Sequence, residues 1–261
     1  MKILFVGDIF GRPGKRVAAK FIPHYITERG IDFCIANGEN AAGGFGMTEN
    51  IAKKFFTYGI DVITSGNHIW DTQESRDVLE QFDRVLRPAN YPDGVPGNGF
   101  IVMEKNGMTL GVINLIGRIF MPPVNCPFRT ADMVIEQVGA MTNCMIIDFH
   151  AEASSEKMAL GWYLDGRVGA VLGTHTHVMT ADERILPRGT AFICDVGMTG
   201  PHDSIIGVKV EQSLQRLLTQ VPVRFSPAEE GLHFSAVILE IDETTGLAQS
   251  IERIFEPYVD E

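Results

Sequence analysis

The sequence has no excess of basic residues. Its 261 residues include 22 lysines and arginines against 33 aspartates and glutamates, which gives a formal net charge of −11. Proteins that bind the backbone of DNA or RNA present clustered Lys and Arg, so this balance argues against general nucleic-acid binding. A small phosphate-bearing substrate stays open, because bound divalent cations can reverse the local electrostatic field.

Long apolar stretches are also missing. No segment approaches the roughly 20 apolar residues that a membrane-spanning helix needs. The amino-terminal stretch MKILFVGDIFGRPG has one lysine and a short apolar run before Asp8, which differs from a secretory signal peptide. We therefore expect a soluble chain with a cytoplasmic location and no membrane partner.

Cysteine is scarce and scattered. Cys34, Cys126, Cys144 and Cys194 form no C-x-x-C pair, and all except Cys126 lie in apolar runs. This distribution favours free thiols in a reducing compartment over disulfides or thiolate metal ligands.

The remaining composition is that of a packed globular protein, with 45% apolar and 21% charged residues. The length suits one large α/β domain or two small ones. Because no repeat, low-complexity tract or linker divides the sequence, we expect a single domain over residues 1–261.

Short apolar runs alternate with helical patterns along the chain. Strands are predicted at residues 2–7, 32–38, 61–66, 144–150, 168–177, 183–186 and 191–195. Helices are predicted at residues 14–29, 48–59, 70–81, 131–141, 154–163 and 208–219, with a kink or break at Pro23. Asn106-Gly107 predicts a hairpin within 99–117, and residues 235–242 and 247–255 predict a closing antiparallel pair. The pattern favours an α/β fold with two layered mixed β-sheets flanked by helices.

Residues able to bind metals follow the predicted strands. They are Asp8, Glu39, Asn40, Asn67, His68, His150, His175 and His177. Ligands of α/β sheets bind at the carboxyl ends of the strands. If these strands are mainly parallel, all eight residues meet at one edge.

Most of these groups also have an ordinary structural explanation. Asp8 can form a turn after a strand, residues 39–40 a solvated turn, and residues 67–68 a helix cap. His150 alone is more often a hydrogen-bonded structural histidine. Their joint occurrence at five strand ends is what favours a common site.

The pair His175 and His177 has the strongest individual signal. In extended backbone, residues two apart point to the same side, so both imidazoles would face one site. Carboxylate, amide oxygen and imidazole without thiolate suit Mn, Fe, Zn or Co. A carboxylate can bridge two such ions about 3.5–4 Å apart, which hold a hydroxide and clamp phosphate oxygens during displacement at phosphorus.

The order of these motifs resembles the calcineurin-like metallophosphoesterases. The matching motifs are Gly7-Asp8, Gly38-Glu39-Asn40, Gly66-Asn67-His68, His150 and Gly173-Thr174-His175-Thr176-His177. Two positions depart from the family pattern. Phe10 stands where the D-x-H motif has histidine, and Glu39 stands where the family has a bridging aspartate.

With these departures, the stretches GDIFGRPG, NGENAAGG, SGNHIWD and DVGMTGP resemble the YmdB-type branch of bacterial phosphodiesterases, nearly end to end. The resemblance implies a four-layer sandwich, a homo-oligomer and a regulatory role in bacterial physiology. It also implies two divalent or trivalent ions, Fe or Mn ahead of Zn or Co, and hydrolysis of 2′,3′- and 3′,5′-cyclic nucleotides.

The resemblance also implies a set of ligands for each ion. One ion would be held by Asp8, Glu39, Asn40 and His177, and the other by Glu39, Asn67, His150 and His175. Glu39 would bridge, and the amide oxygen of Asn40 would replace the imidazole absent at Phe10. After hydroxide attack, His68 is the expected general acid for the departing ribose oxygen, since an unperturbed imidazole with a pKa of about 6.5 suits that task at neutral pH.

Four nearby residues keep two interpretations each. Asp148 either orients a ligand imidazole or is a partly exposed strand carboxylate. Asp195 is interpreted as a turn-forming residue, with a role near the ligands or substrate as the alternative. Phe45 and Met47 either contact a base ring or pack within their loop.

Three other functions are compatible with parts of the pattern. The same site can serve a phosphomonoesterase or protein phosphatase. The absent histidine at position 10 favours a nucleotide-sensing regulatory protein with weak catalysis. An amidohydrolase-type barrel also uses H-x-H, but the late position of that motif and the hairpin at 99–117 argue against it.

Overall fold

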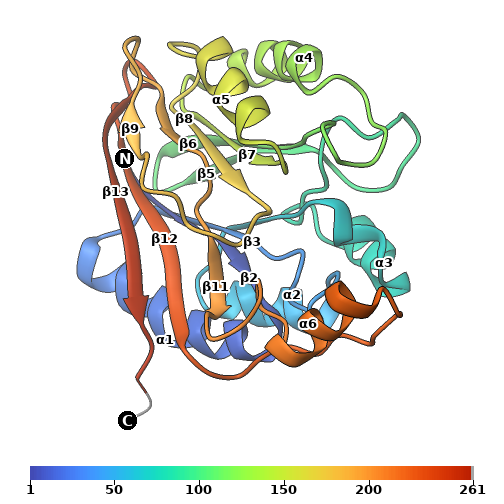
Figure 1. Cartoon of the computed structure of the whole chain (residues 1–261). Coiled ribbons are helices and arrows are strands. Elements are labelled where there is room, and N and C mark those ends of the chain that lie inside the picture. Colours follow the sequence, from blue (N-terminus) through green and yellow to red (C-terminus); the bar gives the residue numbers. More distant parts are fainter. Residues whose placement is uncertain (260–261) are drawn as a thin grey trace.

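Two mixed β-sheets form the centre of the fold, which the computed structural model describes for residues 1–259 (Figure 1). The first sheet has the order β2 (Asp8–Ile9), β11 (Met198–Pro201), β12 (Leu232–Ile241), β1 (Lys2–Val6), β3 (Phe33–Asn37) and β4 (Val62–Thr64), with β13 (Ala248–Pro257) paired to β12. The second has the order β5 (Phe100–Lys105), β6 (Met108–Ile116), β7 (Met145–His150), β8 (Ala170–Thr174), β10 (Ala191–Ile193) and β9 (Arg184–Ile185).

Helices lie around the two sheets. They are α1 (Gly11–Arg29), α2 (Glu49–Thr57), the short 3₁₀ helix η1 (Asn67–Trp70), α3 (Gln73–Gln81), α4 (Pro127–Gly139), α5 (Ser154–Tyr163) and α6 (Val210–Thr219). Figure 1 shows α4 and α5 on one side of the molecule and α1 and α2 on the other.

Side-chain alternation along the strands builds three apolar layers. In β1, Ile3 and Phe5 join the cluster between the sheets, whereas Leu4 and Val6 join the cluster beneath α1 and α2. A third cluster packs α4 and α5 against the second sheet. The order helices, sheet, sheet, helices confirms the predicted fold class.

Parallel pairing brings the site-bearing strand ends together. In the first sheet β1, β3 and β4 run parallel, and in the second β6, β7, β8 and β10 do. Helices α1, α2, α4 and α5 make the crossovers that parallel neighbours require. The candidate residues therefore lie in the segments after β1, β3, β4 and β8 and at the last residue of β7.

Several helices and strands end at the capping and turn residues that the sequence predicts. The Thr48 side chain accepts a hydrogen bond from Ile51 N at 3.3 Å and caps α2. Asn106 and Gly107 have φ values of 54° and 80°, which fits the tight turn between β5 and β6. Gly30, at φ 62°, ends α1.

Some boundaries differ from the sequence-based expectation. Helix α1 begins three residues before position 14 and runs through Pro23, so of the predicted kink or break the break is wrong. Helix α4 begins at Pro127, because proline at the first helical position loses no hydrogen bond. Strand β8 ends at Thr174, and the short pair β2 and β11 was not predicted.

The cysteines are free thiols, as the sequence predicts. All four cysteines are free thiols, and Cys34, Cys144 and Cys194 are buried. None of the helices in residues 1–259 combines the length and apolar character needed to cross a bilayer.

Candidate metal centre

Seven candidate side chains meet where the two sheets face each other. Asp8, Glu39, Asn40 and Asn67 come from the first sheet, and His150, His175 and His177 from the second. Contacts of 3.1 Å between Glu39 Oε1 and His150 Nε2 and of 3.2 Å between Asn40 Oδ1 and His177 Nε2 join the two sides. Asp8, Glu39, Asn40 and His150 are at most 2% exposed.

The first group of atoms surrounds Nε2 of His150. Asn67 Oδ1 lies 3.1 Å from this nitrogen, and His175 Nδ1 lies 3.0 Å from it. The ligand atoms of Glu39, His150 and His175 all lie within 4.8 Å of one another, close enough to share one metal ion.

A threonine determines which nitrogen of His150 faces this group. The Thr174 hydroxyl donates its one hydrogen to Asp148 Oδ1 at 2.7 Å, so it accepts from His150 Nδ1 at 2.9 Å. In the neutral imidazole, Nε2 then carries a lone pair. His175 Nε2 lies 3.1 Å from Glu152 Oε2, which directs the Nδ1 lone pair of His175 inward in the same way.

The second group lies around Nε2 of His177. The ring donates from Nδ1 to the Ile206 carbonyl at 2.8 Å, which leaves the Nε2 lone pair toward Asn40 Oδ1. Asn40 Nδ2 donates to Gly44 O at 3.0 Å and so fixes the amide oxygen inward. Asp8 Oδ1 lies 3.9 Å from His177 Nε2.

These atoms fit a bound cation. Asp8 Oδ1 and Glu39 Oε1 are buried without a hydrogen-bond partner among the described residues, and Glu39 Oε1 is poorly aligned with the nearby His150 nitrogen. Buried acceptors without partners are costly, and with neutral imidazoles these acceptors face other acceptors. A set of carboxylate, amide and imidazole donors without thiolate suits Mn, Fe, Zn or Co.

The carboxylates around His150 favour its protonated form. Burial lowers the pKa of His150, but Glu39, Asp8 and Asp148 outweigh it and raise the pKa to about 9. Burial raises the pKa of Asp8 well above its usual value, whereas the imidazoles overcome burial and lower the pKa of Glu39 to about 2. Burial and His150 lower the pKa of His175 to about 3. A metal ion would displace the His150 proton.

The backbone of the H-x-H motif differs from the prediction. His175 and His177 follow β8 at φ values of 103° and 65°, so the assumption of extended backbone is wrong. Both side chains still reach the centre, but they enter different groups of atoms. A left-handed turn, rather than strand alternation, separates them.

Asp195 holds this turn in place. Its Oδ2 accepts hydrogen bonds from Thr176 N at 3.0 Å, Thr176 Oγ1 at 2.8 Å and Lys157 Nζ at 2.7 Å. Lys157 and Asp195 are each 1% exposed. Asp195 Oδ1 also accepts from Gly197 N at 2.8 Å, so the predicted turn role is confirmed and a buried ion pair is added to it.

Asp148 is buried, so its interpretation as a partly exposed strand carboxylate is wrong. It accepts hydrogen bonds from Asn37 Nδ2, Thr174 Oγ1 and Thr64 Oγ1. Its hydrogen-bond link to His150 runs through the Thr174 hydroxyl.

His68 lies apart from the buried acceptors. Its Nδ1 is 2.7 Å from Asp71 Oδ2, and its ring packs edge-on against Phe45 at 5.0 Å. The His68 side chain is 28% exposed, and its backbone N donates to Glu39 Oε2 at 3.1 Å. Met47, by contrast, is buried in the core beneath α2, which favours packing over contact with a base.

Sequence reasoning missed two groups that orient the histidines. The Thr174 hydroxyl stood inside the G-T-H-T-H motif and carried a recognisable signal. The Ile206 carbonyl carried none, because a backbone acceptor presented by a residue at φ 47° leaves no mark in the residue type.

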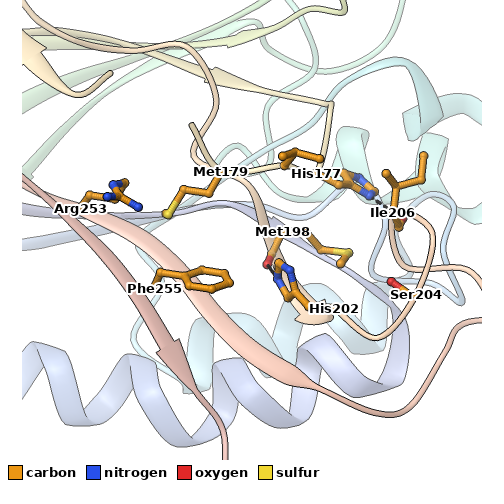
Figure 2. Close-up of a pocket in the computed structure, with 9 residues that line it drawn as sticks. His177, Met179, Met198, His202, Ser204, Ile206, Arg253 and Phe255 are labelled. Atoms are coloured by element: carbon orange, nitrogen blue, oxygen red, sulfur yellow. Dashed lines mark hydrogen bonds between the residues drawn. The ribbon is translucent and has the colours of Figure 1, made fainter. Parts of the chain in front are cut away.

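A cavity of about 290 Å³ adjoins His177 (Figure 2). Met179, Met198, His202 and Phe255 line it, with Arg253 at its far end. Phe255 stacks on His233 with 4.4 Å between ring centroids and 10° between planes. The cavity thus offers thioether and aromatic walls beside a candidate ligand.

The sequence matches the family described as YmdB-like protein over residues 4–254. The chain belongs to this YmdB-like family. A relative from Bacillus subtilis (strain 168), named 2′,3′-cyclic-nucleotide 2′-phosphodiesterase, is 50% identical over 254 residues, which cover 97% of this chain and 96% of the relative.

Two solved structures share the YmdB-like fold. A hypothetical protein from Thermus thermophilus has a TM-score of 0.93 and 42% identity, covering 98% of this chain and 99% of that one. A novel phosphatase from Mycoplasma pneumoniae has a TM-score of 0.91 and 32% identity, covering 98% and 94%.

Within this YmdB-like chain, Phe10 fills the place of the missing D-x-H histidine. Its ring meets His177 edge-on at 5.5 Å, so it packs against a candidate ligand where an imidazole would bind. Gly44 and Gly207 lie so close to Phe10 that a Cβ at either position would touch the ring. The ring is thus packed into the wall beside the second group of atoms.

Proposed function

We propose that the chain is a phosphodiesterase that hydrolyses cyclic nucleotides with a pair of metal ions. The observation that carries this proposal is the convergence of buried lone pairs from both sheets, with Asp8 Oδ1 and Glu39 Oε1 left without partners among the described residues. The name of the Bacillus subtilis relative supports 2′,3′-cyclic nucleotides as the first substrate class, with 3′,5′ forms as the second.

The two groups of atoms supply a ligand set for each ion. One set is Asp8, Glu39, Asn40 and His177, and the other is Glu39, Asn67, His150 and His175. Glu39 is shared between them. The donors suit Fe or Mn, with Zn and Co as alternatives, and supply in the cell decides among them. A bound pair supplies Lewis-acid activation of the phosphate and of the attacking water.

The protein's own contribution is to hold the ligand nitrogens in one tautomer. Thr174 and the Ile206 carbonyl fix the outer nitrogens of His150 and His177, so that both Nε2 atoms face inward. Outer hydrogen bonds of this kind orient metal-binding imidazoles and raise their basicity.

His68 is the proposed general acid. Its Nδ1 faces Asp71, which orients the ring and leaves Nε2 to donate a proton to the departing ribose oxygen. Phe45 packs against the ring and limits its rotation. His68 combines solvent access with a carboxylate partner and is not one of the proposed metal ligands.

The nucleoside part of the substrate is proposed to enter the cavity beside His177 (Figure 2). Its volume of about 290 Å³ lies near the lower end of the roughly 300–1,000 Å³ range of ligand pockets. The exposed Phe255 ring offers a flat surface on which any nucleobase can stack. This feature favours a nucleotide over a simple phosphomonoester.

Two further properties are part of the proposal. A cytoplasmic location is supported by the four free cysteines. A homo-oligomer is supported by α6, whose Leu217 and Leu218 are 64% and 83% exposed. Light scattering at several concentrations tests for self-association, and a monomer throughout excludes it. A regulatory role is tested by comparing a Glu39→Gln strain with a deletion strain.

The decisive experiment combines elemental analysis of the purified chain with a substrate panel. We expect about two metal ions per chain and hydrolysis of 2′,3′-cyclic AMP faster than of p-nitrophenyl phosphate. A chain that stays metal-free after incubation with Mn²⁺ and Fe²⁺ would rule out the centre. Faster release from the monoester would instead support a phosphomonoesterase.

A further inference from the structure

A second cavity, of about 440 Å³, lies between α1 and α2, away from the cavity beside His177. Helix α1 contributes Arg12, Lys15 and Arg16 to its lining, and α2 contributes Lys54. Glu229 is the acidic residue in this lining. Four cationic side chains and one carboxylate thus surround a concave site.

This concentration of positive charge contrasts with the whole chain. The protein has 33 acidic and 22 basic residues and a net charge of −11. Within residues 1–259, no ion pair joins Arg12, Lys15 or Lys54 to a carboxylate. Among the described residues, these three cations therefore have no carboxylate partner of their own.

Lys15 shows the effect of this arrangement. Its Nζ donates to the Ala41 carbonyl at 2.8 Å, a neutral acceptor. Burial and the neighbouring Lys54 lower its pKa. An anion in the cavity would reduce the repulsion between Lys15 and Lys54 and would neutralise their charge.

We propose that this basic cavity binds a small phosphate-bearing molecule. Guanidinium groups match phosphate oxygens with paired donors, and ammonium groups add compact charge. Asn50 and Tyr58 add polar groups, while Ala19 and Ile51 give the cavity an apolar wall. The volume suits a mononucleotide as well as free phosphate, because binding cavities of about 300–1,000 Å³ hold ligands of that size.

The cavity also touches the backbone that supports the candidate metal centre. Lys15 holds the carbonyl of Ala41, and Gly11 N donates to the carbonyl of Asn40 at 2.9 Å. The start of α1 therefore contacts the basic cavity on one side and the Asn40 loop on the other. This inference does not depend on which reaction the centre performs.

Isothermal titration calorimetry of the full-length, metal-loaded chain tests the proposal. The probes are inorganic phosphate and adenosine 3′-monophosphate, each measured with wild type, Arg12→Gln and Lys54→Gln. Losing one charge-assisted contact should weaken binding by roughly 10- to 100-fold. Both side chains are exposed, so the variants should fold. Elemental analysis checks that their metal content is unchanged.

Lys53→Gln is the matched control, because Lys53 is exposed on α2, pairs with Glu49 and does not line the cavity. Wild-type binding by Lys53→Gln with weakened binding by the other two variants supports the site. Equal weakening by all three, or by none, overturns it. Tighter binding of the nucleotide than of phosphate identifies a nucleotide site, and the reverse order identifies a free-phosphate site.

Discussion

The hydroxyl of Thr174 sets the tautomer of His150 because it can donate only one hydrogen. Asp148 takes that hydrogen, so the hydroxyl must accept from the imidazole. In Thr174→Val this relay is lost while the side-chain volume is nearly kept. Metal affinity should fall by about 10- to 100-fold, the usual effect of removing an outer-shell partner.

Metal titration of the purified Thr174→Val chain measures this effect, and Thr174→Ser is the control because it keeps the hydroxyl. Wild-type affinity in the valine variant would show that Thr174 does not orient the ligand.

His68 is expected to affect turnover rather than metal content. Replacing it with alanine should lower kcat by about 10²–10⁴-fold, the usual contribution of an acid–base group. Steady-state kinetics on 2′,3′-cyclic AMP and elemental analysis of the same sample separate the two possibilities. Loss of metal in this variant would place His68 among the ligands instead.

Phe255 is expected to affect substrate binding. Base stacking contributes about 1–3 kcal/mol, so Phe255→Ala should raise KM for 2′,3′-cyclic AMP by roughly 5- to 150-fold. An abasic ribose 2′,3′-cyclic phosphate is the matched substrate, because it has no base to stack. A similar rise in KM for both substrates would show that the base does not bind in this cavity.

At the scale of residues, the sequence predicts which side chains meet. It does not predict the backbone conformation that places them there. Asp8, Glu39 and His150 follow strands whose pairing can be anticipated, so their meeting is predictable. The left-handed turn at His175 and His177 depends on Asp195 and Lys157, which lie distant in sequence. The Ile206 carbonyl has no side-chain signal at all.

At the scale of elements, α5 supports the H-x-H turn through Lys157. In Lys157→Met the Asp195 carboxylate would stay buried without its cation. Such a loss typically costs about 3–5 kcal/mol, so the free energy of unfolding in urea should fall by about that amount. The double variant Lys157→Met/Asp195→Asn should recover part of the loss. A change below about 1 kcal/mol in Lys157→Met would contradict the role given to this pair.

The accuracy of a predicted boundary depends on how many residues of the element show a regular pattern. Helix α5 and the hairpin of β5 and β6 have long, regular signals and match their predicted positions. Strands β2 and β11 have two and four residues, too few for a periodicity, and form because β2 pairs with β11 and β11 with β12. Pro23 is tolerated because its neighbours in α1 still pack against the first sheet.

At the scale of the whole molecule, the candidate ligands come from both sheets. Removing the ions should therefore loosen the contact between the sheets as well as abolish activity. Saturation at about 100 times Kd stabilises a folded protein by about 2.7 kcal/mol, so EDTA should lower Tm by several degrees. Differential scanning calorimetry before and after chelation, with metal added back, measures this shift. An unchanged Tm would mean that the sheets hold together without the ions.

A pair of ions held in this way would link the two β-sheets to each other. Protein molecules without bound ions would separate more often between the two sheets. This local opening would expose the backbone to cellular proteases. The amount of this protein in a bacterium would then rise and fall with its transition-metal nutrition, even at constant synthesis.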